Sequence, residues 1–148
     1  MGQEQPKNPE LETDEIIESP IYFVDFSQEF DYLYSNVFTR TKLDLIDDFL
    51  DHYEINGLRN WKGKISCSWK VPQHYSDWES RSAFAKHYNL WHAHIGLPTW
   101  QSYPNVPFQT SNQVLHFQKI GSFEIKLLTL STHNPIDLPT LENILDEE

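Results

Sequence analysis

The fold is decided by residues 87–97, HYNLWHAHIGL, whose side chains alternate in character as those of a β-strand do. Successive side chains of a strand point to opposite faces of a sheet. One face of the predicted strand consists of Tyr88, Leu90, His92 and His94. The opposite face consists of Asn89, Trp91, Ala93 and Ile95. Gly96 and Pro98 end the strand, because both residues interrupt regular structure.

Downstream of this strand, the chain predicts a hairpin. VLHFQKI at residues 114–120 and FEIKLLTLS at residues 123–131 are rich in aliphatic and aromatic residues, and Gly121-Ser122 forms the turn between them. Three consecutive antiparallel strands are therefore expected. After His133, residues 138–145 predict a short final helix.

Upstream, the chain predicts one strand and two helices. IYFVDF at residues 21–26 is β-branched and aromatic, which favours a strand. Ser27 is expected to cap a short helix over residues 28–37, and Thr41 to cap a second helix that stops at Gly57. Residues 60–81, which contain three tryptophans, are expected to form a long connection with one short strand at residues 65–71.

This order of elements predicts an α+β fold. It consists of a small antiparallel sheet, two N-terminal helices packed on one face and a short C-terminal helix. With 148 residues, 39% of them hydrophobic, the chain suits one domain with one core, which we place at residues 21–148. Residues 1–20 are rich in glutamate and contain few large apolar side chains, so they predict a flexible acidic arm.

Cellular location and redox chemistry follow from what the sequence lacks. No run of apolar residues approaches the length of a membrane span, and the first residues do not resemble a secretory signal. We therefore expect a cytoplasmic protein without membrane partners. Cys67 is the only cysteine, so neither an internal disulfide nor a CxxC metal motif is possible.

Charge is distributed unevenly along the chain. Residues 1–58 carry fourteen acidic and three basic residues, whereas residues 59–133 carry eight basic and three acidic residues. The overall net charge of −11 therefore conceals a basic middle, which also holds six of the seven histidines. This middle segment is the expected anion-binding part of the protein.

Several short motifs follow one another in a fixed order between Ile21 and Leu145. They are the A-H-I-x-L strand at residues 93–97, the Ser111-Asn112 pair before the strand at residues 114–117, the aliphatic strand at residues 125–130, His133, and the helix at residues 141–144. In this order and spacing the chain resembles the RelE/ParE-like superfamily of bacterial toxin-antitoxin systems, and more closely the YafO family of toxins within it.

The resemblance implies an mRNA interferase, an endoribonuclease that cuts mRNA on the ribosome and is neutralised by a cognate antitoxin protein. Such cleavage requires neither a metal nor another cofactor. A base deprotonates the ribose 2′-OH, cations hold the phosphate, and an acid protonates the leaving 5′-oxygen. Histidine suits both proton-transfer roles because its ordinary pKa of roughly 6.5 lies near neutral pH.

The candidate site residues are histidines and nearby cations. His94 is the first candidate for catalysis, because it lies on a predicted strand and in a matching motif. The other candidate catalytic residues are His92, His116 and His133. The candidate phosphate-binding residues are Arg81, Lys86 and Lys119. The aromatic residues Trp91, Trp100 and Tyr103 are candidates for stacking on RNA bases, with packing in the core as the alternative.

Other functions remain open at this point. His92, His94 and His116 are either core histidines or a three-histidine metal site. The chain has Thr110 where members of the toxin family tend to carry an arginine, which puts catalysis in question. The alternative function is a non-catalytic module whose acidic arm and helix dock a basic protein partner.

Overall fold

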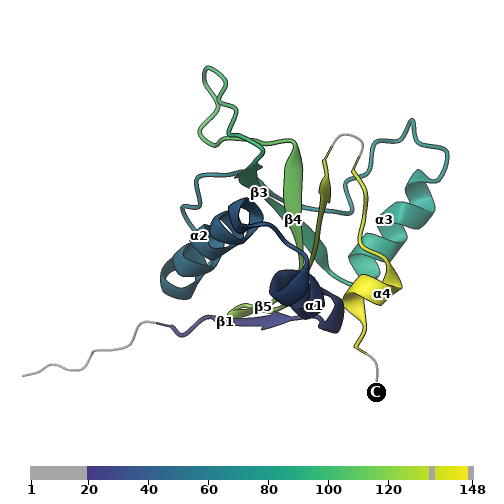
Figure 1. The fold of residues 1–148 in the computed structure, drawn as a ribbon. Helices are drawn as coiled ribbons and strands as arrows, with labels where there is room; N and C mark the ends of the chain where they lie inside the picture. Colours follow the sequence, from purple (N-terminus) through teal and green to yellow (C-terminus); the bar gives the residue numbers. More distant parts are fainter. Residues whose placement is uncertain (1–19, 134–135, 147–148) are drawn as a thin grey trace, which may run out of the picture.

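A computed structural model describes residues 20–133 and 136–146 of the chain. They contain five strands, which are β1 (Phe23–Phe26), β2 (Ile65–Cys67), β3 (Leu90–Leu97), β4 (Gln113–Gly121) and β5 (Glu124–Thr132). The strands form a single sheet in the order β1-β5-β4-β3-β2, flanked by helices (Figure 1). The expected α+β fold is confirmed. The expected acidic arm lies outside the described residues except for Pro20.

The sheet is mixed, so the expectation of a purely antiparallel sheet was wrong. β3, β4 and β5 form the expected antiparallel meander. β1 instead pairs in parallel with β5, with Phe23 opposite Glu124 and Phe26 opposite Leu127. Neighbouring parallel strands need a long connection. Here nearly the whole domain separates β1 from β5, so no local sequence pattern records their pairing.

Two of the four helices in the described residues cover one face of the sheet. They are α1 (Gln28–Asn36) and α2 (Arg40–Asn56). Ser27 caps α1 by accepting a hydrogen bond from the Phe30 N–H at 3.1 Å. The cap of α2 is Thr39 and not Thr41, because the Thr39 hydroxyl accepts the Lys42 N–H. Gly57 ends α2 with a positive φ of 66°, a conformation that favours glycine.

The main core lies between these two helices and the sheet. Its fully buried helix residues are Phe30, Ile46, Phe49 and Tyr53. Its buried sheet residues include Ala93, Ile95, Leu115, Phe117, Ile125 and Leu127. This is the face of β3 that the alternation assigned to Ala93 and Ile95, so the face bearing His92 and His94 points away from α1 and α2.

The opposite face carries two further helices, α3 (Trp78–His87) and α4 (Leu141–Ile144). Figure 1 shows α2 to one side of the sheet and α3 to the other. α3 was not predicted, because its segment was assigned to a long connection and to the start of the next strand. A second small core of Ala85, Leu90, Leu128 and Ile144 joins both helices to the sheet.

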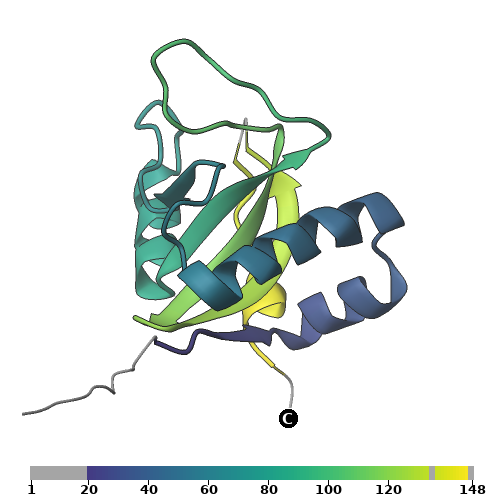
Figure 2. The same ribbon diagram turned by 90° about the vertical axis from the view of Figure 1, so that its left-hand side faces the viewer.

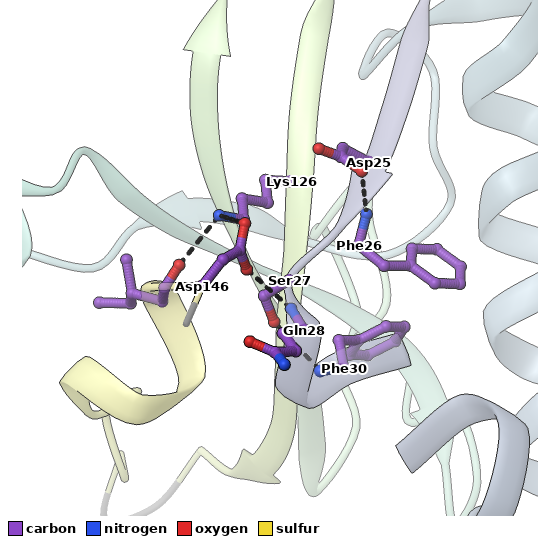
Figure 3. Close-up of polar contacts among 8 residues, drawn as sticks. Asp25, Phe26, Ser27, Gln28, Phe30, Lys126 and Asp146 are labelled. Carbon is purple, nitrogen blue, oxygen red and sulfur yellow. Dashed lines mark hydrogen bonds and ion pairs between the residues drawn. The ribbon is translucent and has the colours of Figure 1, made fainter. Parts of the chain in front are cut away.

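Asp146 fastens the C-terminal segment to the start of α1 (Figure 3). One carboxylate oxygen accepts the Gln28 N–H at 2.9 Å, and the other lies 3.2 Å from Lys126 Nζ on β5. Lys126 also donates to the Ile144 carbonyl at 3.0 Å. These contacts place α4 beside α1, near the start of β5.

The opposite end of the sheet is open and holds the longest loop. Residues 98–112 join β3 to β4 and project beyond the strands (Figure 2). The end of β5 lies at the same end, because Gln113 at the start of β4 pairs with Thr132. Among the described residues, no helix has the length and apolar character needed to cross a membrane.

Candidate functional site

Four histidines gather at the open end of the sheet. They are His92 and His94 on β3, His116 on β4 and His133 just beyond β5. His133 lies closest to the others, with ring centroids 4.7 Å from His94 and 5.3 Å from His92. All four were candidate catalytic residues, and the structure brings all four together.

His94 is oriented by Ser111. The Nδ1 atom of His94 lies 2.9 Å from both the backbone nitrogen and the carbonyl oxygen of Ser111. Ser111 is itself fixed, since its hydroxyl donates to the Gln113 carbonyl at 2.9 Å and accepts the Gly96 N–H at 3.2 Å. The other ring nitrogen, Nε2, is buried and has no hydrogen-bond partner among the described residues. Nε2 is therefore the ring nitrogen of His94 whose hydrogen-bonding capacity is unused.

His133 is placed by the backbone, because its N–H donates to the Asn112 carbonyl at 2.9 Å. Asn112 follows Ser111 directly, so the Ser111-Asn112 pair holds His94 by one residue and His133 by the next. The Ser111-Asn112 motif, which the sequence identified only by its position before a strand, thus positions two of the four histidines.

His92 and His116 are hydrogen-bonded to serine side chains. His92 Nδ1 lies 2.8 Å from the Ser68 hydroxyl. His116 Nε2 lies 2.6 Å from the Ser131 hydroxyl, which donates onward to the Asp137 carbonyl at 2.6 Å. Because the Ser131 proton is used in that bond, Nε2 of His116 must be the donor. His116 is fully buried, so its contacts are structural.

The site holds all four histidines neutral at pH 7. Burial lowers the pKa of His92 to about 3, with further lowering by His116 and His133. Burial likewise lowers the pKa of His94 to about 4 and that of His116 to about 3. The pKa of His133 is lowered by burial and then by the charge of Lys64. Neutral imidazoles are proton acceptors, which suits a site for general-base chemistry.

Lys64 supplies a positive charge beside His94 and His133. Its backbone is bound on both sides, with its N–H donating to Gln109 and its carbonyl accepting the His94 N–H, each at 2.9 Å. Its side chain is exposed and forms none of the ion pairs found in the described part of the chain. Lys64 was not predicted, because its place beside His94 depends on the pairing of β2 with β3.

Two neighbouring pockets share part of their lining, because Lys64 and His133 line both of them. The first, which we call the loop pocket, has a volume of about 300 Å³ and is lined by Lys64, His94, Gln101, Tyr103, Asn112 and His133 among others. The second, the strand pocket, has a volume of about 220 Å³ and is lined by Lys64, Cys67, Lys70, Tyr75, His92 and His133 among others. His116 lines neither pocket.

Two larger hollows lie on the other side of the molecule, beside β1, α1 and α4. The one of about 590 Å³ is lined by Asp25, Asp31 and Asp146 together with Val24, Phe26 and Gln28. The neighbouring hollow of about 490 Å³ is also acidic. Neither contains a histidine, lysine or arginine, so proton transfer and phosphate binding point to the smaller pockets.

The predicted phosphate-binding residues lie outside the two histidine pockets. Arg81 is paired with Asp77 at 3.1 Å and donates to the carbonyl of Ile136, a residue that lines the strand pocket. Lys86 lies on the exposed last turn of α3. Lys119 packs over the Trp91 ring and lines a hollow near Tyr22 and Tyr53. Lys64 and Lys70 are the cations that the pockets contain.

Of the three candidate stacking residues, two pack within the protein and one is exposed. Trp91 packs edge-on against Trp69, and Trp100 packs against Trp61, so both serve the structure. Tyr103 is 54% exposed and lines the loop pocket.

The histidines do not form a metal site of the kind considered for His92, His94 and His116. In residues 20–133 and 136–146, no three or more His, Cys, Asp or Glu side chains are arranged to hold a metal ion. Nδ1 of His92 and Nε2 of His116 are bound to serine hydroxyls instead.

The chain matches no family model, no curated protein and no solved structure. Function must therefore be inferred from the site itself.

Proposed function

We propose that the protein is a metal-independent endoribonuclease, an mRNA interferase that acts as the toxin of a toxin-antitoxin system. The observation that carries this proposal is the pair formed by His94 and His133, 4.7 Å apart, beside Lys64 in an open pocket. Two imidazoles and an ammonium that forms no ion pair among the described residues are the groups that cleavage of a phosphodiester by its own 2′-OH requires.

In the proposed step, one of the two histidines removes the proton from the ribose 2′-OH. The 2′-oxygen then forms a bond to phosphorus, and the bond from phosphorus to the 5′-oxygen breaks. The other histidine, in its protonated form, gives its proton to that 5′-oxygen. The products are a 2′,3′-cyclic phosphate and a 5′-hydroxyl, and Lys64 offsets the charge on the phosphate in the transition state.

Neutral histidines in the free protein are consistent with this chemistry. Lys64 and burial disfavour a proton on His133, but a bound phosphate places negative charge beside the ring. A nearby negative charge favours the protonated imidazole. Binding of RNA therefore raises the fraction of protonated histidine where the acid is needed.

The resemblance to the YafO toxins supplies the biological setting of the proposal. It implies a RelE-like domain in the cytoplasm, mRNA on the ribosome as substrate and a cognate antitoxin as partner. The α+β sheet with two helices before the meander is compatible with such a domain.

Expression in bacteria tests the proposal. Wild-type protein should arrest growth and cleave a translated message, and His133→Ala and Lys64→Gln should abolish both effects while the purified variants stay folded. His87→Ala, at an exposed position on α3, is the matched control and should remain toxic. Unimpeded growth with intact message from folded, well-expressed wild type would overturn the proposal.

The second candidate function is a non-catalytic module that docks a basic partner. It is favoured by the exposed carboxylates of α2, which are Asp44, Asp48, Asp51 and Glu54. Two sets of substitutions distinguish these functions. A docking module should lose partner binding when Asp48→Asn and Asp51→Asn are combined, and should be unaffected by His133→Ala.

A further inference from the structure

We propose that the site binds two consecutive nucleotides of single-stranded RNA, with the phosphate at Lys64 and His133 and one base in each flanking pocket. The identity of the ligand rests on the endoribonuclease proposed above. The geometric observation is independent of it: the loop pocket and the strand pocket are separate hollows that share Lys64 and His133.

The shared pair suits a phosphodiester. Lys64 forms no ion pair in the described part of the chain. Its ammonium lies over the Phe108 ring, 5.6 Å from the ring centroid, and this contact leaves its charge uncompensated by any carboxylate there. His94 is 2% exposed and lines the loop pocket, and its buried Nε2 atom has no hydrogen-bond partner among the described residues. A buried polar atom without a partner is costly, and a ligand oxygen on the pocket side would satisfy it.

The loop pocket suits a nucleobase. Tyr103 offers an aromatic ring, and Gln101 and Asn112 offer amide groups that can both donate and accept hydrogen bonds. Aromatic rings stack on any base, whereas side-chain amides distinguish base edges.

The strand pocket offers a second aromatic ring, that of Tyr75. The guanidinium carbon of Arg81 lies 5.2 Å from the Tyr75 ring centroid, and Arg81 is held in turn by Asp77 and the Ile136 carbonyl. Arg81 thus supports the wall of this pocket and does not bind the phosphate. Lys70, also in this pocket, places a second cation along the path of the RNA backbone.

Two aromatic rings on either side of one cation predict that a dinucleotide binds more tightly than either half. The probes are the sixteen 2′-O-methyl dinucleoside monophosphates, which cannot be cleaved because the attacking hydroxyl is blocked. Binding is measured by calorimetry or NMR titration, with 2′-O-methyl nucleoside 3′-monophosphates and inorganic phosphate as the smaller probes.

We expect the best dinucleotide to bind at least tenfold more tightly than its mononucleotide. Tyr103→Ala and Tyr75→Ala should each weaken dinucleotide binding by about 5- to 150-fold, the range for loss of one stacked base. Both should leave the binding of inorganic phosphate unchanged. Lys64→Gln should weaken all of the probes, and Tyr75→Phe should restore dinucleotide binding because it keeps the ring.

Tyr32→Ala is the matched control, because Tyr32 is 60% exposed on α1 and lines neither histidine pocket. The inference is overturned if dinucleotides bind no better than phosphate, or if folded Tyr75→Ala and Tyr103→Ala bind them as wild type does. If Tyr75→Ala and Tyr103→Ala cleave RNA as wild type does, the two-base site is contradicted but the proposed endoribonuclease activity is not. If dinucleotide binding depends on the two tyrosines but the wild-type protein does not cleave mRNA on ribosomes, the two-base site is supported and the endoribonuclease activity is contradicted.

Discussion

His92 and His116 face each other across β3 and β4, with ring centroids 6.0 Å apart and both side chains buried. Two imidazoles at this separation cannot both carry a proton in an apolar interior without strong repulsion. The proposed proton-transfer residues, His94 and His133, therefore lie next to a histidine pair, His92 and His116, that resists protonation. This relationship links the stability of the fold to pH.

The first prediction concerns stability in mild acid. Burial lowers the pKa values of His92 and His116 to about 3, so between pH 6.5 and that value the unfolded chain binds protons that the folded chain does not. Stability must then fall as pH falls below 6.5, by about 1.4 kcal/mol per pH unit for each such histidine. Urea unfolding at pH 7.0, 6.0 and 5.0 measures this slope.

The His116→Gln variant isolates one contribution, because its amide nitrogen can still donate to the Ser131 hydroxyl. Between pH 6.0 and 5.0 we expect its slope to be smaller than that of wild type by about 1 kcal/mol per pH unit. His87→Gln, at an exposed position, should retain the wild-type slope. Equal slopes for wild type and His116→Gln would contradict the prediction.

The second prediction concerns the glycine that places Lys64. A Cβ atom on Gly63 would collide with the His94 carbonyl oxygen and come within 2.8 Å of Trp61 Nε1, which donates to that same carbonyl. Gly63→Ala should therefore cost about 1–3 kcal/mol of stability, as overpacking does. It should also weaken phosphate binding, because Lys64 moves with its neighbour.

Gly121→Ala is the control for this test, because a Cβ atom at Gly121 would meet nothing within 4 Å. Its stability should stay within about 0.5 kcal/mol of wild type. Thermal unfolding and phosphate titration of both variants give the answer, and equal behaviour of the two would show that the close approach at Gly63 is unimportant.

The third prediction concerns the core that supports the site. Phe49 is fully buried on α2 and packs against the rings of Tyr53, Trp61 and Phe117. Phe49→Ala should cost about 3–5 kcal/mol through lost burial and a cavity. Val37→Ala, at a position 54% exposed, should change stability by no more than about 0.5 kcal/mol. Urea midpoints measure both, and a small loss for Phe49→Ala would place this ring outside the core.

The elements that the sequence predicted are those with a strong local signal. The meander of β3, β4 and β5 alternates clearly and turns at Gly121-Ser122, and α1 and α2 carry apolar residues at helical spacing. α3 gave no such signal, because Ala85 is its only fully buried residue among a few half-buried aromatic side chains. Its contacts with the sheet stabilise the helix, and these are not visible in its own sequence.

The positions of the candidate site residues were predicted in part for the same reason. The histidines were found because their residue type suits proton transfer and because β3 places His92 and His94 on one face. Lys64 was missed, because it reaches His94 only through the pairing of Ile65 with Ala93, a register that no local pattern encodes. The phosphate candidates Arg81, Lys86 and Lys119 were chosen by closeness in sequence, which does not measure closeness in space.

The last prediction concerns the pH dependence of RNA cleavage. The free protein needs one of His94 and His133 neutral and the other protonated. The pKa of His94 is about 4, and that of His133 is lowered from its ordinary value of 6.5 by burial and Lys64. The rate constant kcat/KM reports the free protein, so it should be largest between about pH 4 and 6.5. This result does not depend on which histidine is the base, because either assignment gives the same two limbs.

The constant kcat reports the protein with RNA bound, where the phosphate raises the pKa values of both histidines. Its optimum should therefore lie at higher pH than that of kcat/KM. Both profiles are measured on one substrate between pH 4.5 and 8.5, with circular dichroism at each pH so that acid unfolding is not mistaken for loss of activity. In Lys64→Gln, an NMR titration of His133 should show its pKa moved back toward the ordinary value, because the charge of Lys64 that lowers it is gone. A kcat/KM optimum above pH 7, in protein that is folded throughout, would remove His94 and His133 from the proton-transfer step.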